Sequence, residues 1–356
     1  MPEVPLRALD GLDVIERRVA DLWAELARDG KTVMRACKMN LVVATRADDA
    51  LPELLEDLGR ITDMEPGRVI VLSDRASGGE GGLTPWIAAH CHLGPGGHPV
   101  CSEQIVLETT GEARALLPEA LRRVLVSDMP VFVWWRAPLT DQPLLRPIVD
   151  TADRLIVNSG DASLGNDVLP ILVSMTHSRT WHGNVGDLAW ERTEPWREIV
   201  ASMFDEPRAG AELSRLRSVE IACRGAGEAC GTPGLYLAGW LVSRLGWTVE
   251  GPARARRPDG GSVAIVLASG AASVHGRITH VRLVAESGAV FHAGRTRCDG
   301  PCVRVLGQAG VPRLRHVEPM DDLTLLHGEL QRDGRDPVYE TALRAAAALS
   351  AGPAGP

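Results

Sequence analysis

The sequence is poor in lysine and in the smaller aromatic residues. Its 356 residues include two lysines, Lys31 and Lys38, two tyrosines and three phenylalanines, so arginine carries nearly all of the positive charge. The formal net charge is −8, and no cluster of basic residues is dense enough to follow a phosphate backbone. We therefore expect no nucleic-acid partner.

Long apolar segments are also missing. No stretch approaches the roughly 18 uncharged apolar residues that a membrane-spanning helix needs. The first ten residues carry proline and charges, without the apolar centre of a secretory signal peptide. We therefore expect a cytoplasmic protein that does not enter a membrane. The seven cysteines are then expected to be mostly thiols, because that compartment is reducing.

Motifs of known catalytic chemistry are absent from the sequence as well. It has no GxSxG nucleophile elbow and no GxGxxG dinucleotide fingerprint. The glycine-rich segment Ser77–Gly82 lacks the lysine of a P-loop, and the pair Gly225 and Gly227 lacks a third glycine. These absences predict no catalytic residues and no bound cofactor.

The first half of the chain alternates between apolar strands and amphipathic helices. Strands are predicted at Asn40–Thr45 and Arg68–Ser73, with leucines at helical spacing between them. This order favours a parallel sheet with right-handed crossovers. Two further strands, Trp86–His92 and Glu103–Glu108, are separated by a glycine-rich turn and predict a hairpin.

The pattern changes beyond a break at Pro207–Gly210, where extended segments follow one another with little helix between them. They lie at Ser262–Ala268, His280–Ala285, Ala289–Ala293 and Cys302–Gly307. We therefore expect an α/β N-terminal half, with a mostly parallel sheet and flanking helices, and an α+β C-terminal half with a largely antiparallel sheet. The domains are expected at residues 1–206 and 207–350, followed by a disordered tail at 351–356.

Nine tryptophans stand out against the few other aromatic residues. The segment Asp128–Arg136 is an apolar run that ends in Trp134, Trp135 and Arg136, and it is typical of a strand buried on both faces. Because side chains alternate along a strand, the two rings must lie on opposite faces of the sheet. Sites in open α/β sheets gather at the carboxyl ends of strands, so Arg136 marks an edge where a partner or a small anion would bind.

A second segment, Asp187–Arg197, also places arginines beside tryptophans. Thr193 is a good N-cap for a helix whose apolar face begins at Trp196. Tryptophan and arginine are enriched at protein–protein hot spots and pair through cation–π contacts. The plainer interpretation is that each tryptophan is a core residue. The residues predicted at a partner surface are Trp134, Trp135, Arg136, Trp190, Arg192, Trp196 and Arg197.

Histidines and cysteines near the predicted hairpin suggest a metal site. His90, Cys91 and His92 are zinc-type ligands, with His98 and Cys101 close in sequence. On a strand, however, the first and third of these residues share one face while the second points away. No C-x-x-C pair anchors the set, and we therefore predict no metal.

Cysteine pairs give a weaker redox hypothesis. Cys91 with Cys101 across the hairpin, and Cys298 with Cys302 at C-x3-C spacing, are the candidate redox thiols. Neither pair has the context of a thioredoxin-type active site, and unrelated thiols are the simpler interpretation.

Six segments occur in the order in which one protein family has them. They are His90–His92, Cys101–Leu107, Asp128–Trp135, Ala152–Ser159, Gly186–Arg197 and Ala238–Trp247. Through them the sequence resembles the OpcA family, the glucose-6-phosphate dehydrogenase assembly proteins of cyanobacteria and actinobacteria. The resemblance covers most of residues 35 to 250, and the two tryptophan-rich segments are its most specific part.

The resemblance implies a non-enzymatic scaffold and allosteric activator in the oxidative pentose phosphate pathway. Such a protein binds glucose-6-phosphate dehydrogenase, favours its active oligomer and raises its apparent affinity for substrate. Where relatives commonly carry two adjacent cysteines, this chain has Val100 and Cys101. The alternative is an α/β enzyme or a sugar-phosphate-binding module that uses the cleft beside Trp134 and Trp135.

Overall fold

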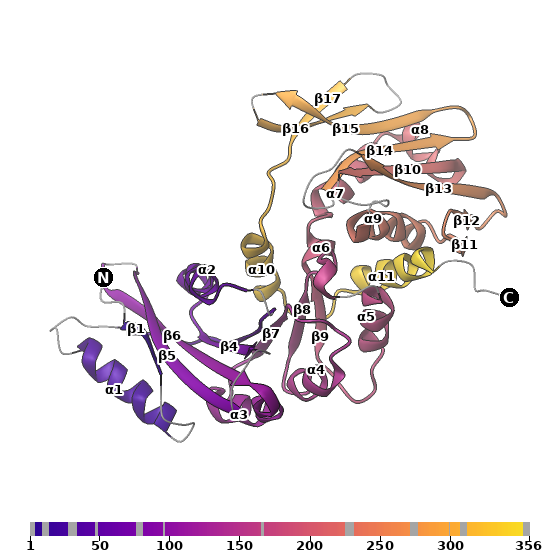
Figure 1. Ribbon diagram of the computed structural model, residues 1–356. Helices are drawn as coiled ribbons and strands as arrows, with labels where there is room; N and C mark the ends of the chain where they lie inside the picture. The colour runs from indigo at the N-terminus through magenta and orange to yellow at the C-terminus, as the bar shows by residue number, and fades with distance from the viewer. Residues whose placement is uncertain are drawn as a thin grey trace.

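The protein contains two mixed sheets with helices packed on them (Figure 1). The first sheet is mostly parallel and belongs to the N-terminal half, and the second is mostly antiparallel and belongs to the C-terminal half, so the predicted fold class is confirmed. The computed structural model describes residues 4–8, 14–27, 34–46, 49–75, 81–94, 97–164, 167–224, 231–270, 277–298, 300–306 and 312–351.

The first sheet has the strand order β1-β5-β6-β4-β3-β7-β8-β9, with β2 paired to β6. Its strands from β6 to β9 in this order are parallel, while β5 runs antiparallel to both β6 and β1. The predicted hairpin is confirmed as β5 and β6. The strands are β1 (Val4–Ala8), β2 (Met34–Arg35), β3 (Asn40–Ala44), β4 (Arg68–Arg75), β5 (Gly82–Leu93), β6 (Pro99–Thr110), β7 (Val131–Trp135), β8 (Arg154–Val157) and β9 (Asn184–Asp187).

Helices cover both faces of this sheet. Nearly every residue of the central strands is apolar, and the helices bury these residues on both sides. Trp134 packs with α2 (Leu51–Met64) on one face, and Trp135 packs with the helices of the other. The prediction that the two rings lie on opposite faces is confirmed. The second face carries α1 (Ile15–Ala27), the 3₁₀ turn η2 (Gly111–Leu116), α3 (Leu117–Val124), α4 (Gln142–Val149), the 3₁₀ turn η3 (Ala162–Leu164) and α5 (Val168–Thr176).

The order in which the chain adds parallel strands to the sheet reverses between the neighbouring strands β3 and β7. From β3 the chain crosses through α2 to β4 on one side, and from β7 it crosses through α4 and α5 to β8 and β9 on the other. In an open α/β sheet this reversal is the topological switch point, where crossovers diverge and the carboxyl ends of two neighbouring strands stay uncovered.

The second sheet is covered by helices on one face. Among its neighbouring strands β10 and β13 are parallel, and the other pairs are antiparallel. Its inner face packs on α7 (Glu194–Ser202) and α9 (Gly231–Arg244). Its order is β11 (Thr248–Gly251), β12 (Arg254–Arg256), β13 (Ser262–Gly270), β10 (Leu216–Arg224), β14 (Arg277–Ala285), β15 (Val290–Cys298), β16 (Gly300–Leu306) and β17 (Pro312–His316), and the short elements α6 (Leu188–Glu191), α8 (Pro207–Gly210) and η4 (Leu213–Arg215) precede β10.

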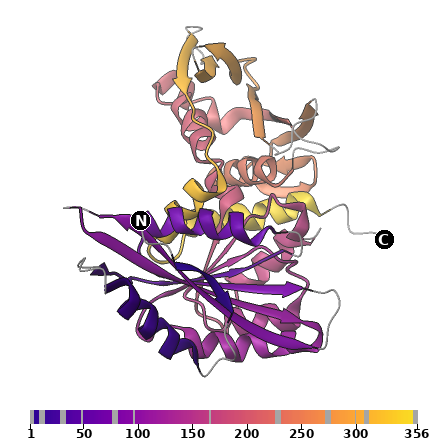
Figure 2. The ribbon, with the colours of Figure 1, turned by 60° about the vertical axis from the view of Figure 1, so that its left-hand side comes forward.

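The last two helices return from the second sheet to the first (Figures 1 and 2, yellow). The helix α10 (Asp322–Leu330) contacts α2 and α6, and α11 (Pro337–Ser350) packs against α9 and α5. Asp321 caps α10 by accepting a hydrogen bond of 2.8 Å from the Thr324 amide. Because α11 joins the apolar core of the first half, the domain boundary after residue 206 stays a prediction.

Two local details differ from the expectations. The strand β7 begins after Pro130 and not before it, because Asp128 has a left-handed backbone with φ of 62° and turns the chain into the sheet. Thr193 occupies the N-cap of α7, but its hydroxyl donates to the Trp190 carbonyl at 2.7 Å and does not cap the helix. In the part of the chain that the structure describes, no helix is long and apolar enough to cross a membrane.

The close contact of α9 with α11 depends on Gly239, and a matched pair of glycine substitutions tests it. A Cβ at Gly239 would collide with the Ala342 carbonyl and lie 2.8 Å from the Ala346 nitrogen. We expect Gly239→Ala to lower the free energy of unfolding by about 1–3 kcal/mol in urea denaturation. A Cβ at Gly328 in α10 meets nothing within 4 Å, so Gly328→Ala is expected to raise the free energy of unfolding by about 0.5–1 kcal/mol. Equal effects of the two substitutions would contradict this account of the helix contact.

Candidate functional site

A belt of alternating arginines and aspartates lines the carboxyl edge of the first sheet. Arg46 follows β3 and donates to Asp161, beyond β8, at 2.7 Å. Asp49 lies 3.1 Å from Arg46 and accepts a hydrogen bond of 2.7 Å from Arg136, which follows β7. The belt comprises Arg46, Asp49, Arg136, Asp161, Arg192 and Asp322.

Arg136 lies over the face of Trp134, with its guanidinium carbon 4.7 Å from the ring centroid. Its side chain is 18% exposed. Burial lowers the pKa of the Arg136 guanidinium, although the Asp49 carboxylate acts in the opposite direction. Trp134 itself is 4% exposed, and its indole N–H finds no acceptor among the described residues. The ring therefore supports the arginine from below and leaves the guanidinium at the surface.

Arg192 reaches the same belt from the other tryptophan-rich segment. It donates to the Met320 carbonyl at 2.8 Å and to Asp322 at 2.5 Å, and its side chain is 19% exposed. The Asp322 carboxylate also acts on the pKa of Arg136, raising it against the larger effect of burial. The structure thus brings Arg136 and Arg192, 56 residues apart in sequence, to the same edge of the sheet, where Asp322 bonds Arg192 and acts on Arg136 only through its charge.

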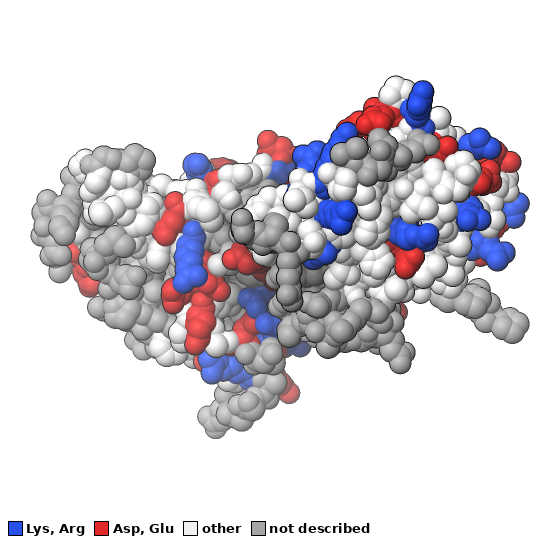
Figure 3. Space-filling model, turned by 90° about the horizontal axis from the view of Figure 1, so that it is seen from above, with Lys and Arg blue, Asp and Glu red and all other residues white. Residues whose placement is uncertain are grey.

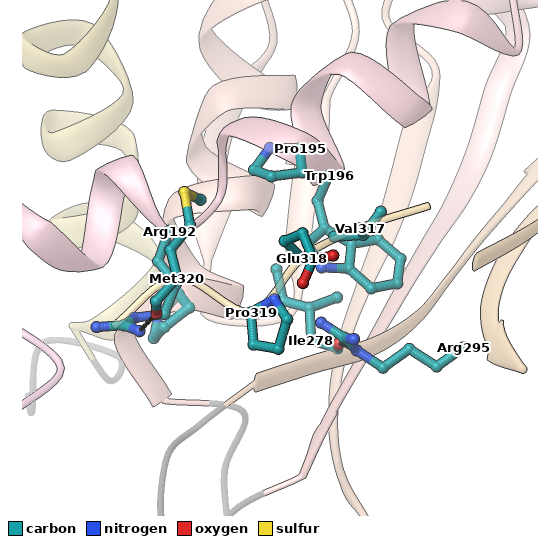
Figure 4. A pocket seen from close by; sticks show the side chains of 10 residues that line it. Arg192, Pro195, Trp196, Ile278, Arg295, Val317, Glu318, Pro319 and Met320 are labelled. Carbon is teal, nitrogen blue, oxygen red and sulfur yellow. Dashed lines mark hydrogen bonds between the residues drawn. The ribbon is translucent and has the colours of Figure 1, made fainter. Parts of the chain in front are cut away.

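A small cavity lies beside Arg192, where the chain passes from the second sheet to α10. Figure 4 shows Trp196, Arg295 and Met320 among the side chains around it. Its volume of about 30 Å³ has room for one water molecule and excludes a metabolite. Trp196 is buried, and the Arg295 guanidinium carbon lies 5.8 Å from its ring centroid.

The remaining predicted residues are buried tryptophans and one partly exposed arginine, Arg197. Trp135 and Trp190 are buried, and the Arg197 guanidinium carbon stacks 3.6 Å from the Trp190 ring centroid. Burial lowers the pKa of Arg197. All four singled-out tryptophans are therefore core residues of this chain. Partner contact stays a prediction, and it now rests on the partly exposed Arg136 and Arg192.

The expectation that the cysteines are mostly thiols is wrong. Cys91 and Cys101 lie directly opposite each other on β5 and β6 and form a buried disulfide, with Cα atoms 4.1 Å apart. Cys223 and Cys302 are also disulfide-bonded, so at least four of the seven cysteines are not thiols, and the side chain of Cys298 lies outside the described residues. Antiparallel pairing brings two such side chains within bonding distance, which composition alone cannot indicate.

The histidines of the hairpin share one face of β5, as predicted. His90 and His92 lie 3.0 and 2.9 Å from the Asp63 carboxylate of α2. In the ranges given above for the structure, no group of three or more histidine, cysteine or acidic side chains is arranged to hold a metal ion.

Charged side chains are also buried between the two halves, away from the belt. Arg154 of β8 and Glu329 of α10 form an ion pair of 3.1 Å, and each side chain is 2% exposed. Arg154 also donates to the carbonyls of Arg332 and Gly334, at 3.0 and 2.5 Å. These bonds hold α10 and the start of α11 against the end of the first sheet.

Asp187 extends this polar cluster to α9. It accepts hydrogen bonds from the Ser159 and Ala189 amides, at 3.1 and 2.9 Å, and from the Tyr236 hydroxyl at 2.6 Å. Burial raises the pKa of Asp187 and also the pKa of Tyr236. A fully buried carboxyl group with three donors fixes the ends of β8 and β9 to α6 and α9.

Glu191 also belongs to this polar cluster, through its ion pair with Arg332. Burial, and then the nearby Glu329 carboxylate, raise the pKa of Glu191 to about 7, although Arg332 lies 2.6 Å away. Burial likewise raises the pKa of Glu329. Sequence reasoning missed both residues. It also missed Arg46 and Asp161, whose positions just after apolar strands were the available signal.

Comparison with known proteins places this chain in a family. One family model, described as the N-terminal domain of a glucose-6-phosphate dehydrogenase subunit, matches residues 59–168. A second, described as the C-terminal domain of the same subunit, matches residues 184–343. Together they span most of the sequence. The chain belongs to the OpcA family.

Three cyanobacterial relatives carry the name "Putative OxPP cycle protein OpcA". The Synechocystis protein is 25% identical over 80% of this chain, and the Nostoc punctiforme protein is 26% identical over 57%. The Synechococcus elongatus protein is 24% identical over 80% of this chain. The chain spans 63%, 44% and 67% of the lengths of these relatives, so it is shorter than each of them.

A solved oxidoreductase from Sinorhizobium meliloti is also similar in part, with a TM-score of 0.44 and 10% sequence identity. The match covers 87% of this chain and 88% of the other. A likeness of this size does not establish a common fold.

The raised pKa of Glu191 predicts a pH-dependent stability. Between about pH 4.5 and 7 the folded protein keeps a proton that the unfolded chain has released, so the free energy of unfolding falls as pH rises. We expect Glu191→Gln, which cannot titrate, to remove up to about 3 kcal/mol of this fall, measured by urea denaturation from pH 5 to 8.

Glu198→Gln is the matched control, because Glu198 is exposed on the neighbouring helix α7. This variant should follow the wild-type profile. Parallel profiles for wild type and Glu191→Gln would show that the glutamate does not carry the proton.

Proposed function

We propose that this protein is a non-enzymatic partner of glucose-6-phosphate dehydrogenase that promotes its active oligomer in the oxidative pentose phosphate pathway. The observation that carries the proposal is the match to both family models described as domains of a dehydrogenase subunit, over residues 59–168 and 184–343. The names of the cyanobacterial relatives, which refer to the same cycle, support it.

The bonding of the buried carboxyl groups supports a non-enzymatic role. The buried carboxylates of Asp187, Glu191 and Glu329 are each bonded to donors of the same chain, and they join secondary-structure elements. A general acid or base must instead reach a bound substrate. In this proposal these three buried carboxylates hold secondary-structure elements together.

An activator of this kind works through differential affinity. It raises the dehydrogenase's apparent affinity for substrate if it binds the active oligomer better than the inactive form, and each tenfold preference corresponds to about 1.4 kcal/mol. A rigid surface suits this role, because a preorganised partner loses less conformational entropy on binding.

The belt is the surface that we propose for the contact. Arg136 and Arg192 are partly exposed, Arg136 stacks on the buried Trp134, and aspartates hold both guanidinium groups in place. Each guanidinium has five N–H donors, so the donors that the aspartates leave free can bond a carboxylate of a partner at this surface, where water and salt screen the aspartate charges as they do not in an enclosed cavity. Elsewhere on the face of the second half seen in Figure 3, basic and acidic side chains are interspersed.

The function predicts a simple kinetic result. The purified protein alone should convert no glucose 6-phosphate, should co-elute with the dehydrogenase of its own organism, and should lower that enzyme's apparent KM. Serum albumin at equal concentration is the control for non-specific protection. Absence of both co-elution and a kinetic effect would refute the assignment.

The contact surface predicts which substitution disrupts binding. Reversing the charge in Arg192→Glu places a carboxylate beside Asp322 and should weaken binding to the dehydrogenase at least tenfold in a titration, since a lost charged pair typically costs 2 kcal/mol or more. Arg192→Lys keeps the charge and should retain part of the affinity.

The control is Arg344→Glu, which reverses an exposed charge on α11, away from the belt. It should bind like the wild type. Unfolding midpoints of all variants separate lost binding from lost structure. If folded Arg192→Glu binds normally, the belt is not the contact surface.

A further inference from the structure

A cavity of about 260 Å³ opens at the switch point of the first sheet. Its wall is formed by residues directly after three neighbouring parallel strands: Thr45 after β3, Asp74 at the end of β4, and Ala137 after β7. Its volume corresponds to roughly nine water molecules, which is the size of a small metabolite. Open α/β sheets bind their ligands at this position, where crossovers diverge on either side.

Charged side chains of both signs line the cavity. Arg114 of η2 lies 2.9 Å from Asp74 and also forms an ion pair with Asp141, at the start of α4. Arg46 lines the same cavity and is paired with Asp161. The arginines therefore have carboxylate partners in this chain already, and the lining offers donors and acceptors in close alternation without an excess of positive charge.

The rest of the cavity wall is mostly aliphatic and belongs to the buried core. Leu117 and Leu144 are buried members of the apolar core, and they belong to helices that cross the sheet on this face. Ser163, in the turn after β8, adds a hydroxyl, and its amide donates to Asp161 at 3.0 Å. A preformed apolar wall with a few fixed polar groups is the usual composition of a small-molecule site.

We propose that this cavity binds a small, uncharged polyhydroxylated molecule of monosaccharide size. A sugar hydroxyl both donates and accepts, so neighbouring hydroxyls can bond a carboxylate and a guanidinium of one pair at the same time. An anion would have to displace Asp74, Asp141 or Asp161 from its arginine and face that carboxylate's charge. The inference is independent of the dehydrogenase, although Arg46 belongs to both the cavity and the belt.

The test is ligand-observed NMR with the full chain, using glucose, ribose and myo-inositol as neutral probes and inorganic phosphate as the anionic one. We expect saturable binding of at least one neutral probe with a dissociation constant of about 1 mM or below, which is typical for a ligand of this size. Phosphate should bind at least tenfold more weakly.

Two substitutions locate the site. Ala137→Leu fills the cavity, and Ser163→Val removes a hydroxyl from its wall with little change in volume. Each substitution should weaken binding of the neutral probe at least tenfold. Ser163→Val remains informative if Ala137→Leu does not fold. The matched control is Ser174→Val, in the wall of a separate cavity of about 370 Å³ between α4 and α5, which should leave binding unchanged.

Three results would overturn the inference. They are an absence of saturable binding by every neutral probe, tighter binding of phosphate than of any neutral probe, and unchanged binding in folded Ala137→Leu or Ser163→Val. Loss of dehydrogenase activation does not bear on it, because the titration contains no dehydrogenase.

Discussion

The arrangement of both halves depends on the buried ion pair between Arg154 and Glu329. Two charges removed from water are costly, and their attraction offsets that cost only when the remaining donors and acceptors are also satisfied. Here the guanidinium has two further carbonyl acceptors in the segment after α10. A glycine in β9, Gly186, leaves room for the Glu329 side chain, because a Cβ at this position would collide with the carboxylate. One end of the first sheet is therefore shaped around a helix that arrives late in the sequence.

The belt follows from this ion pair. Glu329 fixes the C-terminal end of α10, and Asp322 begins the same helix, so the carboxylate that bonds Arg192 is held at a set distance from the sheet. Trp190 reinforces the link through its indole N–H, which donates to Asp336 at 3.2 Å, before α11. The tryptophans thus act on the surface indirectly, since they hold in place the elements from which the arginines project.

Local patterns in the sequence were sufficient to predict the central strands of both sheets, but not the short strands β1, β2, β9, β11 and β12. Alternation along β7 placed Trp134 and Trp135 on opposite faces, and the apolar face that begins at Trp196 packs as its spacing indicates. Pairings across long separations were not predictable, because no local pattern marks Arg154 and Glu329, 175 residues apart, as partners. The edge strand β17 was missed for a different reason: every one of its residues is exposed, so it lacks the apolar alternation by which strands are recognised.

The carboxyl edge of the first sheet therefore carries two surfaces with one physical origin. Crossovers that diverge between β3 and β7 leave backbone ends and polar side chains without a covering helix. The chain neutralises them in two ways. Toward the second half, Arg136 and Arg192 are ordered by aspartates but stay accessible, which suits contact with a large partner. Toward η2, Arg114 and its two carboxylates surround a space enclosed by leucines, which suits a small molecule. Because Arg46 faces both, a ligand in the cavity and a protein on the belt would each influence the position of the same guanidinium.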